Sequence, residues 1–326
     1  MLLYSEPIFL HHETGAHIEN ASRLRLIPDR LAQTGLADQV RRPEWKPVSL
    51  GRLRLVHSPS YIDQVWALAK SGGGQIEVDT IVSPSSYEVA LMAAGAVCDA
   101  VERILRGEDR QALCLVRPPG HHALTSSAMG FCIFNNVAVA ARTAEMELGV
   151  ERILIVDWDI HHGNGTQAAF WEDGHVGFFS IHRWPFYPGT GWEDERGGGE
   201  GLGATLNVPV FFGTPRTIYL EKFRSALEKF ADEIRPELIF ISAGFDTHRL
   251  DPLGGLGLET EDFQTLTQIV LDIAQVHAQG RVISVLEGGY DPEILTDCIE
   301  IHLRTMLAQN PPSISDSEQK IPKNAG

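Results

Sequence analysis

The strongest constraint on the fold of this chain is a repeated pattern, in which a short apolar run ends in a cluster of polar residues and glycines. Five such runs are visible, at residues 112–116, 153–156, 176–179, 238–241 and 282–285. Between them lie segments with apolar residues at helical spacing, at residues 136–148, 215–234 and 260–278. Apolar runs of this length are typical of strands buried on both faces. The alternation therefore predicts a mostly parallel sheet covered by helices on both sides.

The polar clusters follow the carboxyl ends of the predicted strands. They occupy residues 117–122, 157–166, 180–182, 242–246 and 286–290. The carboxyl ends of parallel strands meet at one edge of a sheet, and ligands of such sheets bind there. The sequence therefore predicts one active site that is built from all five clusters.

The chain is long enough, at 326 residues with 43% hydrophobic residues, to bury a sizeable core. Length alone allows one domain or two, but no shift in composition divides the sequence. We therefore expect a single catalytic domain over residues 1–309, followed by a polar, disordered tail at residues 310–326. Nearer the N-terminus we expect a strand at residues 2–4 and helices at residues 22–36 and 87–105.

Charge and composition exclude several classes of protein. A formal net charge of −16 argues against a nucleic-acid partner, because phosphate contacts need clustered Lys and Arg. The four cysteines include no Cys-x-x-Cys pair, which favours reduced thiols over a disulfide framework. The N-terminus lacks the pattern of a signal peptide, and no apolar run approaches the ~20 residues that span a bilayer. We expect a cytoplasmic protein with no membrane association, and the sequence does not indicate its oligomeric state.

Asp159, His161 and Asp246 are the candidate metal ligands. If the strand at residues 153–156 continued, Asp157, Asp159 and His161 would all project to one side of it. Carboxylates that converge away from water need a cation to neutralise them. Three protein ligands leave the fourth position of a zinc ion open for water, as in catalytic sites. The alternative is an exposed polar loop in which the histidines are satisfied by hydrogen bonds.

His121, His122 and Tyr290 are the candidate catalytic groups. Imidazole titrates near neutral pH, so the histidine pair could perform acid–base catalysis, with Asp157 orienting one ring. The phenol of Tyr290 could donate a hydrogen bond to the oxyanion of a tetrahedral intermediate. The alternatives are capping or surface roles for the histidines and a tyrosine packed at the sheet edge.

Five segments, in the same order along the chain, resemble the zinc-dependent histone deacetylase family. They are Arg-Pro-Pro-Gly-His-His at 117–122, Gly-Phe-Cys-Ile-Phe-Asn-Asn at 130–136, Asp-Trp-Asp-Ile-His-His-Gly-Asn-Gly-Thr-Gln at 157–167, Ser-Ala-Gly-Phe-Asp at 242–246 and Leu-Glu-Gly-Gly-Tyr at 286–290. Trp158 and Asn164 are more similar to class II and bacterial members than to class I. The resemblance implies the three-layer α/β/α arginase/deacetylase fold and hydrolysis of an acetyl amide.

The resemblance also implies roles for single residues. One zinc ion per chain would be bound by the three candidate ligands named above. His122 would act as general base and then as general acid, and His121 would be its electrostatic partner. Tyr290 would polarise the amide carbonyl together with zinc. Family members carry a monovalent cation, usually potassium, and the matching positions are Asp157, Ser180 and Ile181.

The substrate positions depart in part from the family pattern. Gly130 and Phe131 would line the acyl-lysine tunnel, and Tyr187 would form the facing wall in place of the commoner Phe. Leu253 stands where polyamine-specific members have a glutamate, which disfavours acetylpolyamines because an apolar residue cannot pair with a second ammonium group. Asp79 is a candidate carboxylate for gripping the substrate backbone. The alternative for Asp79 is an acidic residue that merely flanks a helix.

Asn164 is a further departure, because class I members have an aspartate at this position. A neutral amide stabilises imidazolium less than a carboxylate would, so we expect a lower pKa for His122 than in class I.

Three functional hypotheses follow from these residues. The first is a zinc amidohydrolase that deacetylates N-ε-acetyl-lysine in proteins, peptides or related small amides. The second is the same chemistry on acetylpolyamines or another small acetylated amine. The third is a non-catalytic module that binds acyl-lysine on the same fold.

Overall fold

A parallel sheet forms the centre of the chain, of which the computed structural model describes residues 1–309. The tail that we expect to be disordered, residues 310–326, lies outside the described residues. The strands, in their order across the sheet, are β1 (Leu2–Tyr4), β4 (Gln111–Cys114), β9 (Val282–Leu286), β8 (Leu238–Ala243), β5 (Ile153–Asp157), β6 (Val176–Trp184) and β7 (Thr205–Phe211). Each neighbouring pair is parallel, so the predicted sheet is confirmed.

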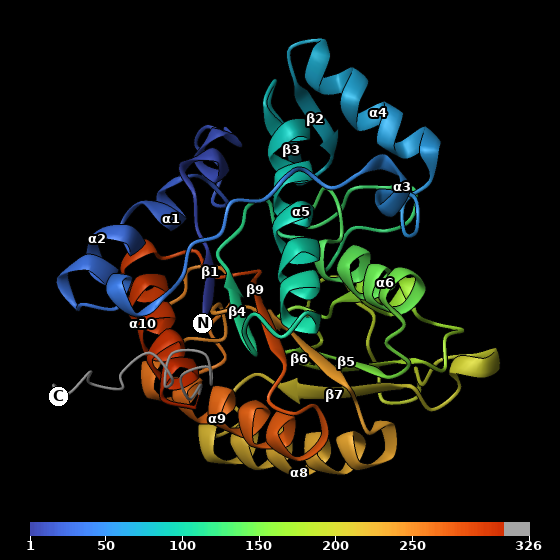
Figure 1. Cartoon of the computed structure of the whole chain (residues 1–326), viewed down its shortest axis with the longest axis vertical. Coiled ribbons are helices and arrows are strands. Elements are labelled where there is room, and N and C mark those ends of the chain that lie inside the picture. Colours follow the sequence, from blue (N-terminus) through green and yellow to red (C-terminus); the bar gives the residue numbers. More distant parts are fainter. Residues whose placement is uncertain (310–326) are drawn as a thin grey trace, which may run out of the picture.

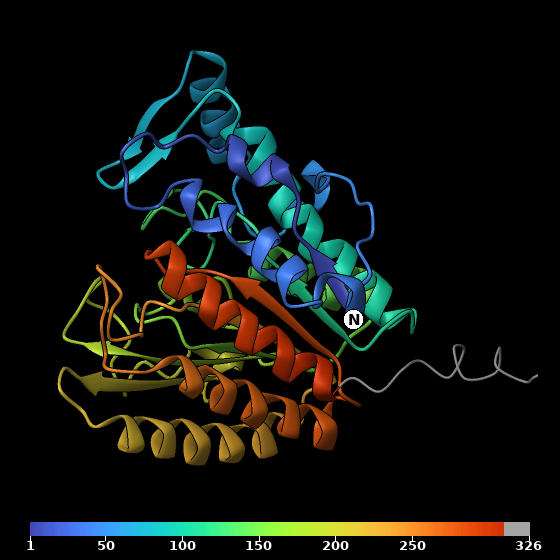
Figure 2. The ribbon, with the colours of Figure 1, turned by 90° about the vertical axis from the view of Figure 1, so that its left-hand side faces the viewer.

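Helices cover both faces of this sheet (Figure 1). On one face lie α5 (Ser86–Leu105) and α6 (Asn136–Leu148). On the other lie α8 (Arg216–Ile234) and α9 (Thr260–His277), with α10 (Pro292–Gln309) packed beside α9. Figure 2 shows the sheet between α5 and the pair formed by α8 and α9. Strands β5, β8 and β9 are buried along their whole length, as apolar runs on both faces require, and the three-layer α/β/α architecture is confirmed.

Several strand boundaries differ from the sequence-based prediction, and two of these differences concern candidate site residues. Strand β5 ends at Asp157, so Asp159 and His161 lie in the following loop rather than on one face of a continuing strand. Strand β6 continues to Trp184, so the polar residues 180–182 lie within the strand rather than after it. Pairing with β5 continues only to Ser180, whereas pairing with β7 continues to Trp184 and extends β6 beyond its apolar run.

The sequence-based prediction missed two of the larger elements, strand β7 and helix α10. Strand β7 lies at the edge of the sheet and contains Asn207 and Pro209, which interrupt the apolar run expected of a buried strand. Proline is tolerated there because an edge strand has one unpaired side.

The N-terminal third forms smaller elements around α5. The helix expected at residues 22–36 is divided into α1 (Ser22–Arg25) and α2 (Ile27–Gln33), because Pro28 starts a new helix. A hairpin of β2 (Gly74–Glu77) and β3 (Thr80–Val82) follows α4 (Pro59–Lys70), as Figure 1 shows. Asp79 lies in the turn of this hairpin, so the alternative of a helix-flanking residue is wrong. The short helices are η1 (Pro7–His11), η2 (Ala37–Gln39), α3 (Leu50–Leu53), α7 (Asn164–Ala169) and η3 (Gly199–Gly201).

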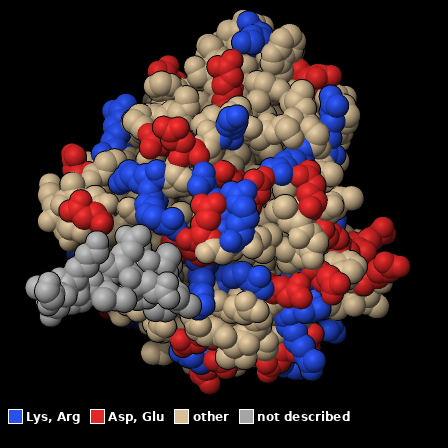
Figure 3. Space-filling view, in the orientation of Figure 1, with Lys and Arg blue, Asp and Glu red and all other residues tan. Residues whose placement is uncertain are grey.

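Charged groups of both signs are mixed on the face of the molecule drawn in Figure 3. Ion pairs between neighbours, such as Arg103 with Asp99 and Arg52 with Glu147, are frequent among the described residues. Such partly exposed pairs contribute about 0–1 kcal/mol each, so they do not determine the fold. Among residues 1–309, no helix combines the length and the apolar character that crossing a bilayer requires.

Candidate active site

The three candidate metal ligands meet where the order of strands across the sheet reverses. Strands β5, β6 and β7 follow one another to one side, whereas β8 and β9 are added on the other side of β5. Asp159 and His161 follow β5, and Asp246 follows β8, its direct neighbour. Crevices at such reversals are the usual ligand sites of open parallel sheets. The strand order therefore brings these distant segments together.

The separations between the three side chains fit a metal ion. His161 Nδ1 lies 3.0 Å from Asp159 Oδ1 and 3.2 Å from Asp246 Oδ2. All three residues are buried. In a tetrahedral zinc site with bonds of about 2.0 Å, the ligand atoms are roughly 3.3 Å apart. One imidazole and two carboxylates at these distances are therefore a suitable donor set for zinc.

Two glycines allow the backbone to approach these carboxylates. A Cβ atom at Gly244 would lie 2.2 Å from Asp159 Oδ2, and one at Gly288 would lie 2.3 Å from Asp246 Oδ2. Gly288 instead donates its backbone N–H to Asp159 Oδ2 at 2.8 Å. A side chain at either glycine would displace a candidate ligand.

The electrostatic field of the site favours a cation. Burial opposes a charge on His161, but hydrogen bonds to Asp159 and Asp246 raise its pKa to about 9. Burial and the neighbouring Asp159 raise the pKa of Asp246 to about 7. Both pKa values are shifted because two carboxylates are packed together away from water. A divalent cation would relieve their repulsion.

His121 and His122 lie beside these ligands, in the loop between β4 and α6. His121 Nδ1 donates a hydrogen bond to Asp157 Oδ2 at 2.9 Å, and His122 Nδ1 donates one to Asn164 Oδ1 at 2.7 Å. The two imidazole centroids are 4.0 Å apart, and that of His122 is 5.8 Å from that of His161. Both histidines are buried, so the alternative of a surface role is wrong.

The surroundings drive the pKa values of the two imidazoles apart. Burial lowers the pKa of His121, but the carboxylates of Asp157 and Asp159 outweigh burial and raise it to about 10. Burial lowers the pKa of His122 well below its ordinary value, and the neighbouring His121 and His161 lower it further. Near neutral pH the pair therefore offers one charged and one neutral imidazole, an arrangement suited to acid–base catalysis.

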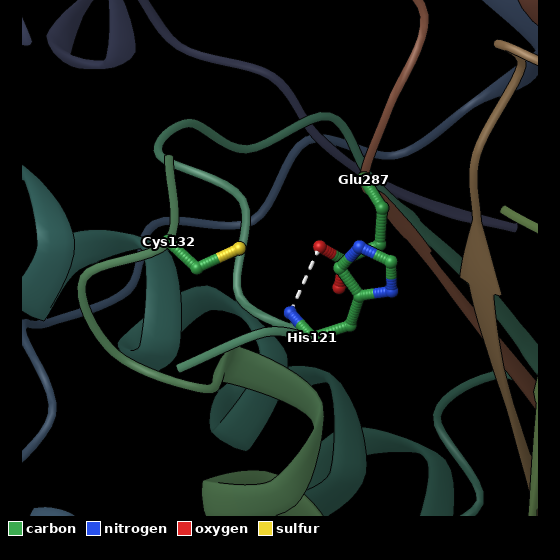
Figure 4. A group of neighbouring side chains, drawn as sticks. All are labelled: His121, Cys132 and Glu287. Carbon is green, nitrogen blue, oxygen red and sulfur yellow. Dashed lines mark hydrogen bonds between the residues drawn. The ribbon is translucent and has the colours of Figure 1, made fainter. Parts of the chain in front are cut away.

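Glu287 holds the loop that carries the histidine pair, and sequence reasoning assigned it no role. Its Oε2 accepts the backbone N–H groups of Gly120 at 2.7 Å and of His121 at 3.2 Å. Figure 4 shows the contact with His121. The side chain is fully buried, and burial raises its pKa to about 7. The sequence signal that could have revealed this role is the position of Glu287, an acidic residue directly after a buried strand.

Tyr290 is fixed from two sides, and only 8% of its surface is exposed. Its backbone N–H donates to Asp251 Oδ2 at 2.7 Å. Like the contacts of Glu287, this one was not indicated by the sequence. The guanidinium of Arg23 lies over its ring, 4.8 Å from the centroid, and Arg23 Nε donates to Gly289 O at 2.6 Å. Burial raises the pKa of its phenol well above the ordinary value, and the nearby carboxylates of Asp246 and Asp159 raise it further, so Tyr290 lies close to the candidate metal ligands. Its catalytic role stays a prediction.

Two buried arginines support the loops of the site. Glu19 accepts hydrogen bonds from Arg23 at 3.0 Å and from Arg117 at 2.8 Å, and all three side chains are buried. Arg117 begins the segment that carries the histidine pair. Removing one partner of such a buried pair costs about 3–5 kcal/mol, so this triad fixes the loops relative to each other.

The candidate tunnel residues surround the site. The ring of Phe131 lies 5.8 Å from that of Tyr290, and the ring of Tyr187 lies 5.2 Å from that of His122. Asp79 joins the two walls, because its carboxylate accepts the backbone N–H of Gly130 at 3.1 Å and the hydroxyl of Tyr187 at 3.0 Å.

The remaining predicted positions lie close to these groups. Ser180 is the register partner of Asp157 in the neighbouring strand, and its Oγ lies 2.9 Å from His182 Nδ1. Ile181 is buried next to it. Leu253 donates its backbone N–H to Asp251 Oδ1 at 2.9 Å, on the carboxylate that also holds Tyr290. A potassium site and a substrate contact at these positions stay predictions.

Comparison with known proteins identifies the family to which the chain belongs. Residues 17–306 match the histone deacetylase domain. The histone deacetylase-like amidohydrolase of Pseudomonas aeruginosa is 37% identical over 283 residues, which cover 86% of this chain and 74% of that protein. The human polyamine deacetylase HDAC10 is 39% identical over 331 residues, which cover 96% of this chain and 49% of that protein. The solved HD domain of HDA15 superposes with a TM-score of 0.89 at 34% identity, covering 94% of this chain and 91% of that one.

A parallel α/β/α sheet with a cation-attracting site at its carboxyl edge, together with these similarities, defines the class of protein: a deacetylase with the arginase/deacetylase fold. The chain belongs to the histone deacetylase family. The resemblance seen in the sequence is therefore confirmed.

Proposed function

We propose that the chain hydrolyses N-ε-acetyl-lysine in proteins or peptides with the help of one zinc ion, within a single catalytic domain at residues 1–309. One observation carries the proposal: the buried cluster of Asp159, His161 and Asp246 lies beside a histidine pair with separated pKa values. Asp159, His161 and Asp246 would hold the ion. When bound, zinc supplies a Lewis acid for the amide carbonyl and lowers the pKa of water to about 7.

His122 is the proposed proton carrier. Its Nδ1–H is engaged by Asn164, so Nε2 of the neutral ring is free to accept the proton of the attacking water. The same nitrogen then returns the proton to the leaving lysine amine. His121, held by Asp157, keeps its positive charge and stabilises the negative charge that develops on the substrate.

Tyr290 is the proposed hydrogen-bond donor to the carbonyl oxygen. Burial raises the pKa of its phenol well above the ordinary value, so the hydroxyl keeps its proton at working pH. Such a donor is most effective in a site from which water is excluded, where it favours the transition state over the bound substrate.

The tunnel residues support a substrate with an unbranched chain. The rings of Phe131 and Tyr187 would flank the lysine methylenes, with Gly130 in the same wall, and Asp79 would accept an N–H group of the substrate backbone. We also propose that Asp157, Ser180 and Ile181 hold a monovalent cation, with potassium as the candidate.

The function is tested by metal analysis combined with a panel of acylated peptides and polyamines. We expect one zinc ion per chain in the active enzyme and turnover of an acetyl-lysine peptide that a chelator abolishes. Binding of the peptide without turnover would instead favour the non-catalytic module.

Acetylpolyamines are the second candidate substrates, because a relative at 39% identity is named a polyamine deacetylase. Leu253 disfavours them, since it offers no negative charge to a second ammonium group. Leu253→Glu should raise kcat/KM for acetylputrescine relative to an acetyl-lysine peptide by roughly fivefold, equivalent to about 1 kcal/mol for a partly exposed ion pair. Leu253→Gln is the matched uncharged control and should leave the ratio unchanged. An unaltered ratio in the glutamate variant would remove Leu253 from the specificity site.

Asn164→Asp should raise the pKa of His122, because a carboxylate 2.7 Å from Nδ1 stabilises imidazolium better than an amide. His122 must be neutral to accept a proton, so activity falls as pH drops through its pKa. The acid limb of the pH profile of kcat/KM should therefore move to higher pH, together with the histidine NMR titration. Asn164→Ala removes the hydrogen-bond acceptor of His122. In this variant the acid limb and the NMR titration of the histidine should both move to lower pH. A limb that stays in place in both variants would contradict the assignment of His122.

A further inference from the structure

A second group of metal-binding side chains lies next to the proposed zinc site and shares no residue with it. It consists of His121, Cys132 and Glu287, whose ligand atoms all lie within 4.8 Å of one another. His121 and Cys132 lie in the loop between β4 and α6, and Glu287 directly follows β9. All are buried, and Figure 4 shows the thiol and the carboxylate directed toward the same space beside the imidazole.

Glu287 has one oxygen that nothing in the described protein satisfies. Its Oε2 accepts two backbone N–H groups, whereas its Oε1 is fully buried and has no hydrogen-bond partner among the described residues. An unpaired buried carboxylate oxygen is costly, and its free energy is lowered by a donor or a cation. Cys132 Sγ donates a weak hydrogen bond of 3.3 Å to Gly130 O and accepts one from the backbone of His122.

The chemistry of the group selects the kind of ion. A thiolate and a carboxylate cancel the charge of a divalent cation, so the filled site would be neutral in the interior. Sulfur and imidazole favour zinc or cadmium over magnesium or calcium. Three atoms no more than 4.8 Å apart surround a point at most about 2.8 Å from each. Movements of less than about 1 Å would give the bond lengths of a zinc site.

We propose that His121, Cys132 and Glu287 form a second, inhibitory binding site for a thiophilic divalent cation such as zinc. Binding displaces the thiol proton of Cys132 and the ring proton that the bound nitrogen of His121 carries, and both go to solvent. The bound nitrogen of His121 can then no longer donate a hydrogen bond to the negative charge that develops on the substrate, which is the role proposed for His121 above. This inhibition rests on the proposed function, whereas the binding of the ion does not.

Cadmium provides the direct test, because a cadmium thiolate has an ultraviolet charge-transfer band and a site of carboxylates and imidazole has none. The metal-depleted full chain should bind two cadmium ions, one of which produces the band. Cys132→Ser and Cys132→Ala should bind one ion and produce no band. Cys98→Ser, at another buried cysteine, is the matched control and should bind two cadmium ions and produce the band.

Excess zinc should inhibit the wild-type enzyme and Cys98→Ser, whereas the Cys132 variants should need at least tenfold more zinc for the same inhibition. Their turnover without excess zinc should be unchanged, since the proposed mechanism gives Cys132 no role. A single cadmium ion without the band in the wild type, or equal inhibition in all variants, would overturn the proposal. If no acylated substrate is turned over, the proposed function fails, but cadmium stoichiometry and the band still report on the second site.

Discussion

Asp246→Asn should reduce bound zinc from one ion per chain to nearly none and lower kcat for an acetyl-lysine peptide by about a thousandfold or more. The change removes one of two anionic ligands, and the ion contributes several kcal/mol to stabilising the transition state. Metal analysis after dialysis and steady-state kinetics measure the two effects.

The folded state should survive this substitution. Burial and Asp159 raise the pKa of Asp246 to about 7, so its ionised form is disfavoured in the metal-free site and a neutral amide of the same shape relieves repulsion. The melting temperature of the metal-free variant should therefore equal or exceed that of the metal-free wild type. Asp232→Asn, at a carboxylate that is 75% exposed, is the control and should keep zinc and activity. Full zinc occupancy in Asp246→Asn would show that the ligands are assigned wrongly.

Tyr290→Phe should lower kcat by roughly 10²–10³-fold with little change in KM and with zinc retained, because one donor to the developing oxyanion is lost. The substitution should leave the ring in place. Asp251 holds the backbone N–H, and Arg23 and Phe131 contact the ring rather than the hydroxyl. Kinetics with the acetyl-lysine peptide, together with metal analysis, measure this effect.

Tyr187→Phe is the matched control, because it also removes one phenol hydroxyl from the same site. That hydroxyl already donates to Asp79, and the proposed mechanism gives it no contact with the substrate carbonyl. We expect a change of less than about tenfold in kcat, the scale of one ordinary hydrogen bond. Equal losses in the two variants would mean that Tyr290 supports the tunnel and does not stabilise the oxyanion.

Most of the sheet could be predicted because each central strand is a run of consecutive apolar residues, which indicates burial on both faces. Strands β5, β8 and β9 are apolar on both faces, and each is followed by a polar cluster. Strand β7 escaped prediction because an edge strand tolerates Asn207 and Pro209. The extension of β6 to Trp184 depends on hydrogen bonds to β7, which no local pattern in β6 reveals.

The sequence by itself determined the parallel α/β/α fold, the family and the segments that form the site, because burial period and motif order are properties of consecutive residues. Only the tertiary structure decided that Glu287 holds the histidine loop, that Asp251 holds Tyr290 and that Asp79 joins Gly130 to Tyr187. Each of these contacts joins residues at least 39 positions apart in the chain. Such contacts form when buried polar groups find partners after the chain has packed, so they leave no periodic signal in the sequence.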